Sequence, residues 1–328
     1  MARVTDRLHL VFFGGEPMTR WRSLAAMTEA AKAMASQTGV RVNPTVTTNG
    51  TLLNPKRAAW LAEQGFVVAI SCDGIQDAHD ANRVDAHGGG SYGETVQGLR
   101  AAIDAGVQVR CILVVDPANV AMLDRSIAHL TSLGVADLVL NPNWSADWNS
   151  PALREAWSLA YGRVSALYVD SYRAGKPFWL STIDAKIAAH LKGGYLPSDR
   201  CDLGRKNLVV APGGNLYPCD RLVGDDTDPR FVIGHVSTGP DALRVRAITG
   251  KSDLLPAECL PCAVAKRCRN RCVCANVAMT GEVDAPSELL CFHEQLSIRT
   301  ADDAARQLID EANALFVRRH YGSGLQSG

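Results

Sequence analysis

Eight of the chain's ten cysteines lie between Cys201 and Cys291. Cysteines crowded into one segment indicate metal ligation or disulfide bonds. Seven of them follow two spacings, C-x12-G-x4-C around Gly214 and C-x2-C-x5-C-x3-C, with a last cysteine 18 residues later. In chain order these are Cys201, Cys219, Cys259, Cys262, Cys268, Cys272 and Cys291, and Cys274 lies outside both patterns.

Three kinds of chemistry could use these thiols. Residues 1–10 are polar and do not read as a secretory signal, so a reducing compartment and metal ligation are favoured over disulfides. A tetrahedral zinc site needs only four cysteines. Thiolates two and five residues apart, joined by Cys291, can surround one iron–sulfur cluster. We therefore expect iron–sulfur binding, with zinc and disulfides as the alternatives.

Composition limits the partners that the chain is expected to have. Lys and Arg number 34, as do Asp and Glu, and 47% of the residues are hydrophobic. A balanced charge does not favour nucleic acid, and no apolar run is long enough to span a membrane. We predict a cytoplasmic protein with neither a nucleic-acid nor a membrane partner.

Cys72 and Cys111 lie in or at the end of apolar strands and are expected to be buried structural thiols.

Apolar runs rich in β-formers alternate with segments of helical periodicity in the first half of the chain. This alternation predicts parallel βαβ units. The expected strands are residues 8–13, 40–48, 66–71, 107–115 and 137–140, and the expected helices are residues 21–37, 55–64, 92–105 and 122–133.

Polar loops follow these strands. They are Gly14-Gly15-Glu16-Pro17, Thr48-Asn49-Gly50, Ser71 to Gly74 and Asn141-Pro142. In an α/β barrel the active site is built from loops at the carboxyl ends of the strands. Two glycines allow backbone carbonyls to approach a cation closely, and the carboxylate of Glu16 adds charge.

The second half of the chain has weaker patterns. Aromatic residues between Trp144 and Tyr168 recur at helical spacing, which favours a core position over the alternative, a peptide groove. We expect a bridge over residues 175–200, a hairpin of residues 208–211 and 216–218 whose second strand Cys219 closes, an amphipathic helix over residues 299–319 and a frayed tail over residues 322–328. The cations Lys266, Arg267, Arg269 and Arg271 could stabilise an anionic cluster, form a solvated face or dock an acidic peptide.

The cysteine order, with Gly214 before Cys219, resembles the SPASM domain of radical SAM peptide-modifying enzymes such as the anaerobic sulfatase-maturating enzymes. That resemblance implies two auxiliary [4Fe–4S] clusters. It assigns Cys259, Cys262, Cys268 and Cys291 to an outer cluster and Cys201, Cys219 and Cys272 to an inner one.

The loops after the strands resemble the radical SAM half of the same family. Gly-Gly-Glu-Pro is similar to the motif that grips the methionyl amino group of S-adenosylmethionine, and Ser71 with Arg83 is similar to the pair that holds its ribose and carboxylate. The cofactor-binding residues implied are Gly14, Gly15, Glu16, Pro17, Asn49, Ser71, Asp73 and Arg83.

The implied architecture is a partial radical SAM (β/α)6 barrel over residues 1–175 that lacks its first βα unit. A bridge and SPASM domain over residues 176–298 and a C-terminal helix and tail over residues 299–328 would follow.

The implied function is oxidation or cross-linking of a peptide or protein by a 5′-deoxyadenosyl radical, in sulfatase or ribosomal-peptide maturation. Asp220 would be the catalytic base; alternatively it is a turn carboxylate that pairs with Arg221 or Arg205.

Two departures from the family pattern stand out. A further inner-cluster cysteine is expected where Tyr195 stands, so the fourth ligand is Tyr195, Asp199, Cys274 or none. The sequence also contains no C-x3-C-x2-C motif for the catalytic cluster. A truncated enzyme, a split enzyme and a degenerate, non-catalytic homologue are the possible explanations. A partner chain or self-association would then complete the sheet edge beside Leu8 to Phe13.

Overall fold

The structure is a computed structural model that describes residues 6–201 and 203–322. These residues form two compact units. The first comprises the described part of Met1–Asn143, Asn149–Thr182 and Asp310–Phe316; the second comprises Trp144–Trp148 and the described parts of Ile183–Ile309 and Val317–Gly328. Each unit is described separately below.

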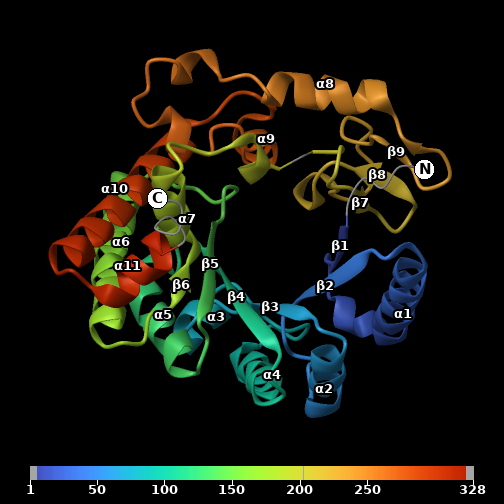
Figure 1. Cartoon of the computed structure of the whole chain (residues 1–328), viewed down its shortest axis with the longest axis horizontal. Coiled ribbons are helices and arrows are strands. Elements are labelled where there is room, and N and C mark those ends of the chain that lie inside the picture. The colour runs from blue at the N-terminus through green and yellow to red at the C-terminus, as the bar shows by residue number, and fades with distance from the viewer. Residues whose placement is uncertain (1–5, 202, 323–328) are drawn as a thin grey trace. The chain divides into compact units, whose positions relative to one another are not determined.

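A six-stranded parallel sheet forms the centre of the first unit (Figure 1). Its strands follow chain order and are β1 (Arg7–Phe12), β2 (Arg41–Thr48), β3 (Val67–Ser71), β4 (Gln108–Val115), β5 (Asp137–Pro142) and β6 (Trp179–Leu180). Every neighbouring pair is parallel. The predicted α/β arrangement with a parallel sheet is confirmed, although β6, only two residues long, was not predicted.

Helices connect the strands of the first unit. They are α1 (Trp21–Thr38), α2 (Pro55–Glu63), the short α3 (Gln76–Asp80), α4 (Tyr92–Asp104), α5 (Leu123–Ser132) and α6 (Pro151–Arg173). Figure 1 shows α1, α2, α4 and α5 along the outer side of the curved sheet. Local signals fix their ends: Asn54 caps α2 by accepting the Arg57 N–H, and Gly39, in the left-handed region at φ 68°, ends α1.

The aromatic residues of α6 belong to the core. Trp157, Tyr161 and Tyr168 are all at most 1% exposed. The Tyr168 ring packs against those of Tyr172 and Phe178 within the first unit. The core prediction is therefore confirmed for these side chains, and the peptide-groove alternative has no support from them.

Strand β1 lies at the edge of the sheet, where it pairs with β2. Leu8, Val11 and Phe13 are 44%, 56% and 55% exposed. The predicted edge position is confirmed. The unpaired backbone N–H and C=O groups of an edge strand can pair with another strand, and exposed apolar side chains beside them favour such an association.

The second unit is built around a small antiparallel sheet in the order β10-β9-β8-β7. Its strands are β7 (Val209–Val210), β8 (Asn215–Tyr217), β9 (Gly234–His235) and β10 (Gly239–Pro240), and its helices include α8 (Ala242–Ser252) and α9 (Val273–Thr280). Helices α7 (Ser181–Leu191), α10 (Glu288–Asp310) and α11 (Ala314–Tyr321) have residues in both units. Buried Leu216, Tyr217, Ile233, Val245 and Val273 form its core, which also includes Cys219.

Several boundaries in the second half differ from prediction. The helix expected over residues 299–319 is broken, because Ala312 adopts a φ of 51° and the Asn313 side chain then accepts the Phe316 N–H to start α11. The bridge expected over residues 175–200 contains β6 and α7. Cys219 lies two residues beyond β8, after Pro218, which has no N–H for strand pairing. The predicted tail lies outside the described residues from position 323 onward.

None of the helices in the described ranges combines the length and apolar character needed to cross a membrane.

Gly98 on α4 should be intolerant of a side chain. A β-carbon built there lies 2.0 Å from the Gly50 carbonyl oxygen, in the loop after β2. We expect Gly98→Ala to lower the free energy of unfolding by about 1–3 kcal/mol in urea titrations. Gly162→Ala, on the exposed side of α6 with open space around it, is the matched control and should be neutral or stabilising. Equal effects of the two substitutions would contradict this close approach.

Candidate functional site

The Glu16 carboxylate joins the loop after β1 to the end of β2. Its Oε1 accepts hydrogen bonds from Met18 N at 2.9 Å and Thr48 Oγ1 at 2.8 Å. Its Oε2 accepts the Asn49 N–H at 2.7 Å. A carboxylate has about four acceptor positions, so one position on Oε2 is left for a ligand.

Gly14 and Gly15 leave open space beside that carboxylate. Their φ values are 98° and 51°, in the left-handed region that favours glycine. A β-carbon built at either residue would meet no atom within 4 Å. Pro17 follows Glu16 as the first residue of the 3-10 turn Pro17–Arg20. The backbone at the two glycines is therefore accessible to a bound group.

The Asn49 loop is fixed by its own hydrogen bonds and by α4. Asn49 Oδ1 accepts from the backbone N and the hydroxyl of Thr51, at 3.0 and 2.8 Å. The Thr95 hydroxyl donates to the Asn49 carbonyl at 2.9 Å. Thr48 and Thr95 were not predicted as site residues, because hydroxyls that position a loop carry no motif of their own.

Asp73 and Arg83 form a bidentate ion pair at the end of β3. Arg83 Nε donates to Asp73 Oδ2 at 2.6 Å, and Nη2 donates to Oδ1 at 2.9 Å. Asp73 Oδ1 also accepts the Val114 N–H at 2.8 Å. The Asp73 side chain is 2% exposed and that of Arg83 is 21% exposed. Asp73 therefore positions Arg83, whose remaining N–H groups can reach a ligand.

His79 supports the same pair and was missed by sequence reasoning. The Asp73 N–H donates to His79 Nδ1 at 3.3 Å, which places the ring proton on Nε2, 3.1 Å from Ser91 Oγ. The Ser91 hydroxyl donates in turn to the Arg83 carbonyl at 3.0 Å. Burial lowers the pKa of His79. By contrast, the Ser71 hydroxyl makes no hydrogen bond among the described residues.

The structure thus brings Gly14, Gly15, Glu16 and Pro17 together with Asn49, and Asp73 together with Arg83, at the carboxyl edge of one parallel sheet. Ser71 is the last residue of β3, two residues before Asp73.

All ten cysteines are unpaired thiols. Cys72 and Cys111, in the first unit, are fully buried as predicted, and burial raises the pKa of Cys72 to about 11. The other eight lie in the second unit.

Four of these eight thiols influence one another and form the outer group: Cys259, Cys262, Cys268 and Cys291. Burial is the main cause that raises the pKa of Cys259, and Cys291 and Cys262 raise it further. Burial also raises the pKa of Cys268 strongly, with contributions from Glu294 and Cys291. These are the four residues that the resemblance assigns to the outer cluster, and their role as cluster ligands stays a prediction.

The other four form the inner group: Cys201, Cys219, Cys272 and Cys274. Burial and then Cys272 raise the pKa of Cys201. The Cys272 and Cys274 sulfurs lie 3.5 Å apart, and this contact is the main cause that raises the pKa of Cys272. The neighbouring Cys219 contributes most to raising the pKa of Cys274 to about 11.

The residue types of the two groups are those that ligate iron–sulfur clusters, because such clusters are held by cysteine thiolates. Among the described residues, no three His, Cys, Asp or Glu side chains are close enough to hold a single metal ion. A tetrahedral zinc ion needs four sulfurs about 2.3 Å from one point, whereas a cluster spreads its ligands over several irons. Raised thiol pKa values mean that metal binding must release protons.

A buried ion pair lies beside the outer group. Lys186 Nζ is 2.5 Å from Glu294 Oε2, and each side chain is 4% exposed. Glu294 Oε2 also accepts the Arg269 N–H at 2.6 Å, and Lys186 donates to the Arg267 carbonyl at 3.2 Å. Although burial alone would raise the pKa of Glu294, the Lys186 ammonium holds it below its ordinary value.

Asp220 follows Cys219 and accepts a weak hydrogen bond from its thiol at 3.4 Å. Arg205, one of the two arginines considered as its partner, pairs with Asp253 at 2.7 Å instead.

Among the basic residues near the outer group, Arg267 forms a bidentate pair with Asp302. Arg271 donates to the Asp253 carbonyl.

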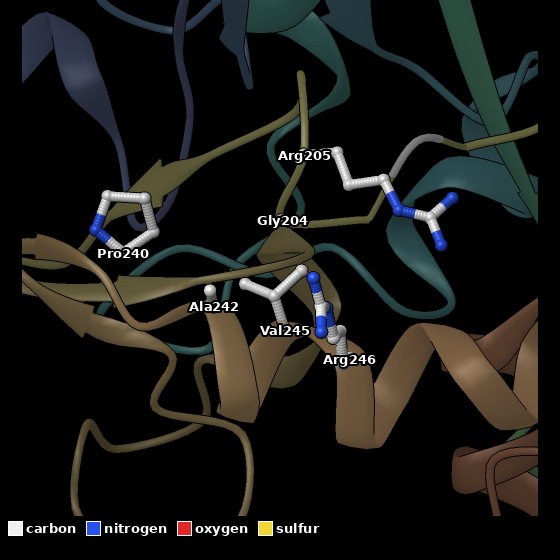
Figure 2. Close-up of a pocket in the computed structure, with 6 residues that line it drawn as sticks. All are labelled: Gly204, Arg205, Pro240, Ala242, Val245 and Arg246. Atoms are coloured by element: carbon white, nitrogen blue, oxygen red, sulfur yellow. The ribbon is translucent and has the colours of Figure 1, made fainter.

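Figure 2 shows an open hollow of about 260 Å³ in the second unit. It is lined by the segment after Cys201, by the end of β10 and by the start of α8: Gly204, Arg205, Pro240, Ala242, Val245 and Arg246. None of the predicted cofactor or cluster residues lines it.

Removing the charge of Glu16 should loosen the loop. A glutamine at this position keeps one oxygen and turns an NH₂ group toward backbone or hydroxyl donors. We expect Glu16→Gln to lower the free energy of unfolding by about 1–3 kcal/mol in urea titrations. Glu29→Gln, on the exposed surface of α1, is the control and should change it little. Equal losses in the two variants would show that the Glu16 hydrogen bonds do not hold the loop.

The buried His79 should make stability depend on pH. Its folded pKa lies below the unfolded value of about 6.5, so the unfolded chain binds the proton more readily. The free energy of unfolding should therefore fall as the pH drops below about 6.5, toward the folded pKa. His79→Asn should weaken this dependence, whereas His87→Asn, in an exposed loop, should retain it. A pH profile unchanged in His79→Asn would contradict the burial effect.

Comparisons with known proteins agree with the first-unit geometry. Residues 2–129 match the radical SAM superfamily. The chain is 27% identical over 278 residues to the serine-type anaerobic sulfatase-maturating enzyme of Klebsiella aerogenes, a match that covers 81% of this chain and 66% of that enzyme. It is 30% identical over 285 residues to the serine-type enzyme of Bacteroides thetaiotaomicron, with 77% and 66% covered. The chain thus spans about two thirds of the length of these relatives.

The fold is also similar to a solved structure, native anSMEcpe with bound AdoMet and the Kp18Cys peptide. The TM-score is 0.75 at 16% identity, and the match covers 94% of this chain and 86% of that one. At this identity the likeness shows the fold alone. The chain contains a radical SAM domain, and its homologues include the anaerobic sulfatase-maturating enzymes.

Proposed function

We propose that this chain is a radical SAM/SPASM-type component that modifies a peptide or protein side chain after translation. The main support is an agreement between the two halves of the chain: a radical SAM match covers residues 2–129, and eight unpaired thiols lie downstream, seven of them at the spacing that resembles a SPASM domain. In this proposal the six-stranded sheet is a partial barrel, and the second unit is a SPASM domain in a reducing cytoplasm.

The loops of the first unit would hold S-adenosylmethionine. When bound beside a reduced cluster, this cofactor supplies a carbon-centred radical that removes a hydrogen atom from the substrate. The open backbone at Gly14 and Gly15 and the remaining acceptor position of Glu16 suit an ammonium group. The unpaired Ser71 hydroxyl and the remaining Arg83 donors suit a ribose and a carboxylate.

The second unit would hold two auxiliary clusters. The outer group supplies four thiolates, and Cys201, Cys219 and Cys272 supply three to the inner cluster. Cys219 and Cys259 are buried and Cys268, Cys272 and Cys291 are partly buried, whereas Cys201 and Cys262 are exposed. The backbone N–H of Asn270 is hydrogen-bonded to the Cys268 sulfur. Such hydrogen bonds to cluster sulfurs tune the reduction potential.

Asp220 would take the proton that the substrate releases during its oxidation. It is partly buried, and Cys201 and Cys219 are among its neighbours. A positioned carboxylate beside an electron acceptor is suited to this step, because proton loss allows the second electron to leave the substrate carbon.

Two substrate classes fit the proposal: a sulfatase and a small ribosomal peptide. The relatives are named for sulfatase maturation, and a structural neighbour was solved with a peptide. We favour the small peptide, because Tyr195 replaces a cysteine expected in the sulfatase-directed enzymes.

Iron content after anaerobic reconstitution tests the proposal. About eight irons per chain are expected from two auxiliary clusters. About twelve irons, with 5′-deoxyadenosine formed on reduction, would indicate a third, catalytic cluster. About eight irons without cleavage of S-adenosylmethionine would support the alternative, a binding or electron-carrying subunit for a partner that supplies the catalytic cluster. Protein that stays colourless or holds only zinc would refute the proposal.

A further inference from the structure

A buried ion pair holds the peptide groups on both sides of Cys268. Lys186 Nζ, on α7, donates to the Arg267 carbonyl at 3.2 Å, and Glu294 Oε2, on α10, accepts the Arg269 N–H at 2.6 Å. Arg267 and Arg269 are the two neighbours of Cys268 in the chain. The ammonium and the carboxylate are themselves 2.5 Å apart, so one ion pair fixes the backbone of this cysteine from both sides.

The same carboxylate is linked to a second cysteine of the outer group. Glu294 follows Cys291 by three residues on α10, and residues at this spacing lie on the same face of a helix. The ion pair therefore connects Cys268 of the loop with Cys291 of the helix, although the two are far apart in the sequence. Two of the four outer thiols thus share one positioning element.

Further contacts keep Lys186 in place. The Arg267 guanidinium donates to the Lys186 carbonyl at 3.3 Å, while the Arg267 carbonyl accepts from the Lys186 ammonium. Arg267 also donates to both carboxylate oxygens of Asp302 on α10, at 2.6 and 2.9 Å. The Tyr195 hydroxyl lies 3.4 Å from Lys186 Nζ. These contacts join α7, the loop and α10 around the ion pair.

Structural support alone does not require charged side chains at this position. Lys186 and Glu294 are each 4% exposed, and an apolar pair of similar volume would avoid the free energy that is needed to bury two charges. Buried charges act strongly on a neighbouring charged centre, because water and salt screen them little. The reduction potential of an iron–sulfur cluster depends on the charge around it. The ion pair is therefore suited to act on a cluster held by Cys268 and Cys291.

We propose that Lys186 and Glu294 are positioning residues of the outer cluster that also set its reduction potential. This inference rests on the proposed function, because it requires the outer cluster of that site. The Lys186 ammonium stabilises the reduced, more negative cluster and raises the potential, whereas the Glu294 carboxylate lowers it. The two opposed charges hold the potential at an intermediate value while they fix the ligands.

Removal of the two charges one at a time tests this role. The whole chain is reconstituted anaerobically, and the potential of each cluster is measured in a redox titration followed by electron paramagnetic resonance. Lys186→Met should lower the potential of the outer cluster, and Glu294→Gln should raise it. Lys186→Arg, which keeps the charge, should remain close to the wild type. The double variant Lys186→Met/Glu294→Gln should lie between the two single variants.

Three control variants accompany the titration. Cys262→Ser changes one outer ligand and so identifies the signal of the outer cluster. Arg230→Gln and Asp228→Asn remove the charges of an ion pair in the same unit whose side chains are 66% and 39% exposed. These two variants should leave both potentials unchanged, because solvent screens exposed charges.

The remaining charge must persist in each single variant. Titration at about pH 8 favours an ionised Glu294 in Lys186→Met, and the anionic cluster keeps Lys186 protonated in Glu294→Gln. If either variant fails to fold, Glu294→Asp provides a milder change. It keeps the charge but withdraws the carboxylate from the Arg269 N–H, so it should still raise the potential of the outer cluster.

Three outcomes would overturn the inference. Shifts of the same sign in Lys186→Met and Glu294→Gln would show that the pair supports the structure only, as would unchanged potentials in these variants or in Glu294→Asp. A larger shift in the inner cluster than in the outer would place the pair at the wrong cluster. If the wild type holds two clusters, these results leave the proposed function intact; if it holds none, the proposed function itself fails.

Discussion

The buried ion pair between Lys186 and Glu294 anchors the cysteine loop of the second unit. The loop between α8 and α9 contains only two short 3-10 turns, and its Leu254 and Leu260 are each 70% exposed, so apolar packing does little to hold it. Glu294 instead accepts the Arg269 N–H, and Lys186 donates to the Arg267 carbonyl. A buried charge left without its partner typically costs about 3–5 kcal/mol, so α7, α10 and the loop are expected to be held together by this pair.

The loop contributes Cys259, Cys262 and Cys268 to the outer group, which Cys291 of α10 completes. The inner group combines Cys272 and Cys274, at the start of α9, with Cys201 and Cys219 from earlier in the chain. Burial is the main cause that raises the pKa of Cys259, and the contact with Cys274, followed by burial, is the main cause for Cys272; both disfavour the thiolate form. A bound cation reverses that effect by neutralising the negative charge and displacing the protons. The free energy that is needed to deprotonate these thiols without a metal is therefore offset when a metal binds.

Much of the first unit could be predicted from the sequence. Alternating apolar runs and caps such as Asn54 and Gly39 are local signals, and five of the six strands follow them. The role of Glu16 could be predicted only in part. The motif identifies the carboxylate, but its bonds to Thr48 and Asn49 join residues 32 and 33 positions away, which no local pattern encodes. His79 was missed for the same reason. The second unit was harder, because its strands have only two or three residues. The break at Ala312, in the first unit, could not be predicted either, because no glycine marks it.

The most direct test of two clusters in the second unit is anomalous diffraction at the iron absorption edge from crystals grown without oxygen. The account predicts two strong iron peaks in this unit, one among Cys259, Cys262, Cys268 and Cys291 and the other among Cys201, Cys219, Cys272 and Cys274. A single peak spanning both groups, or peaks only at the zinc edge, would contradict it.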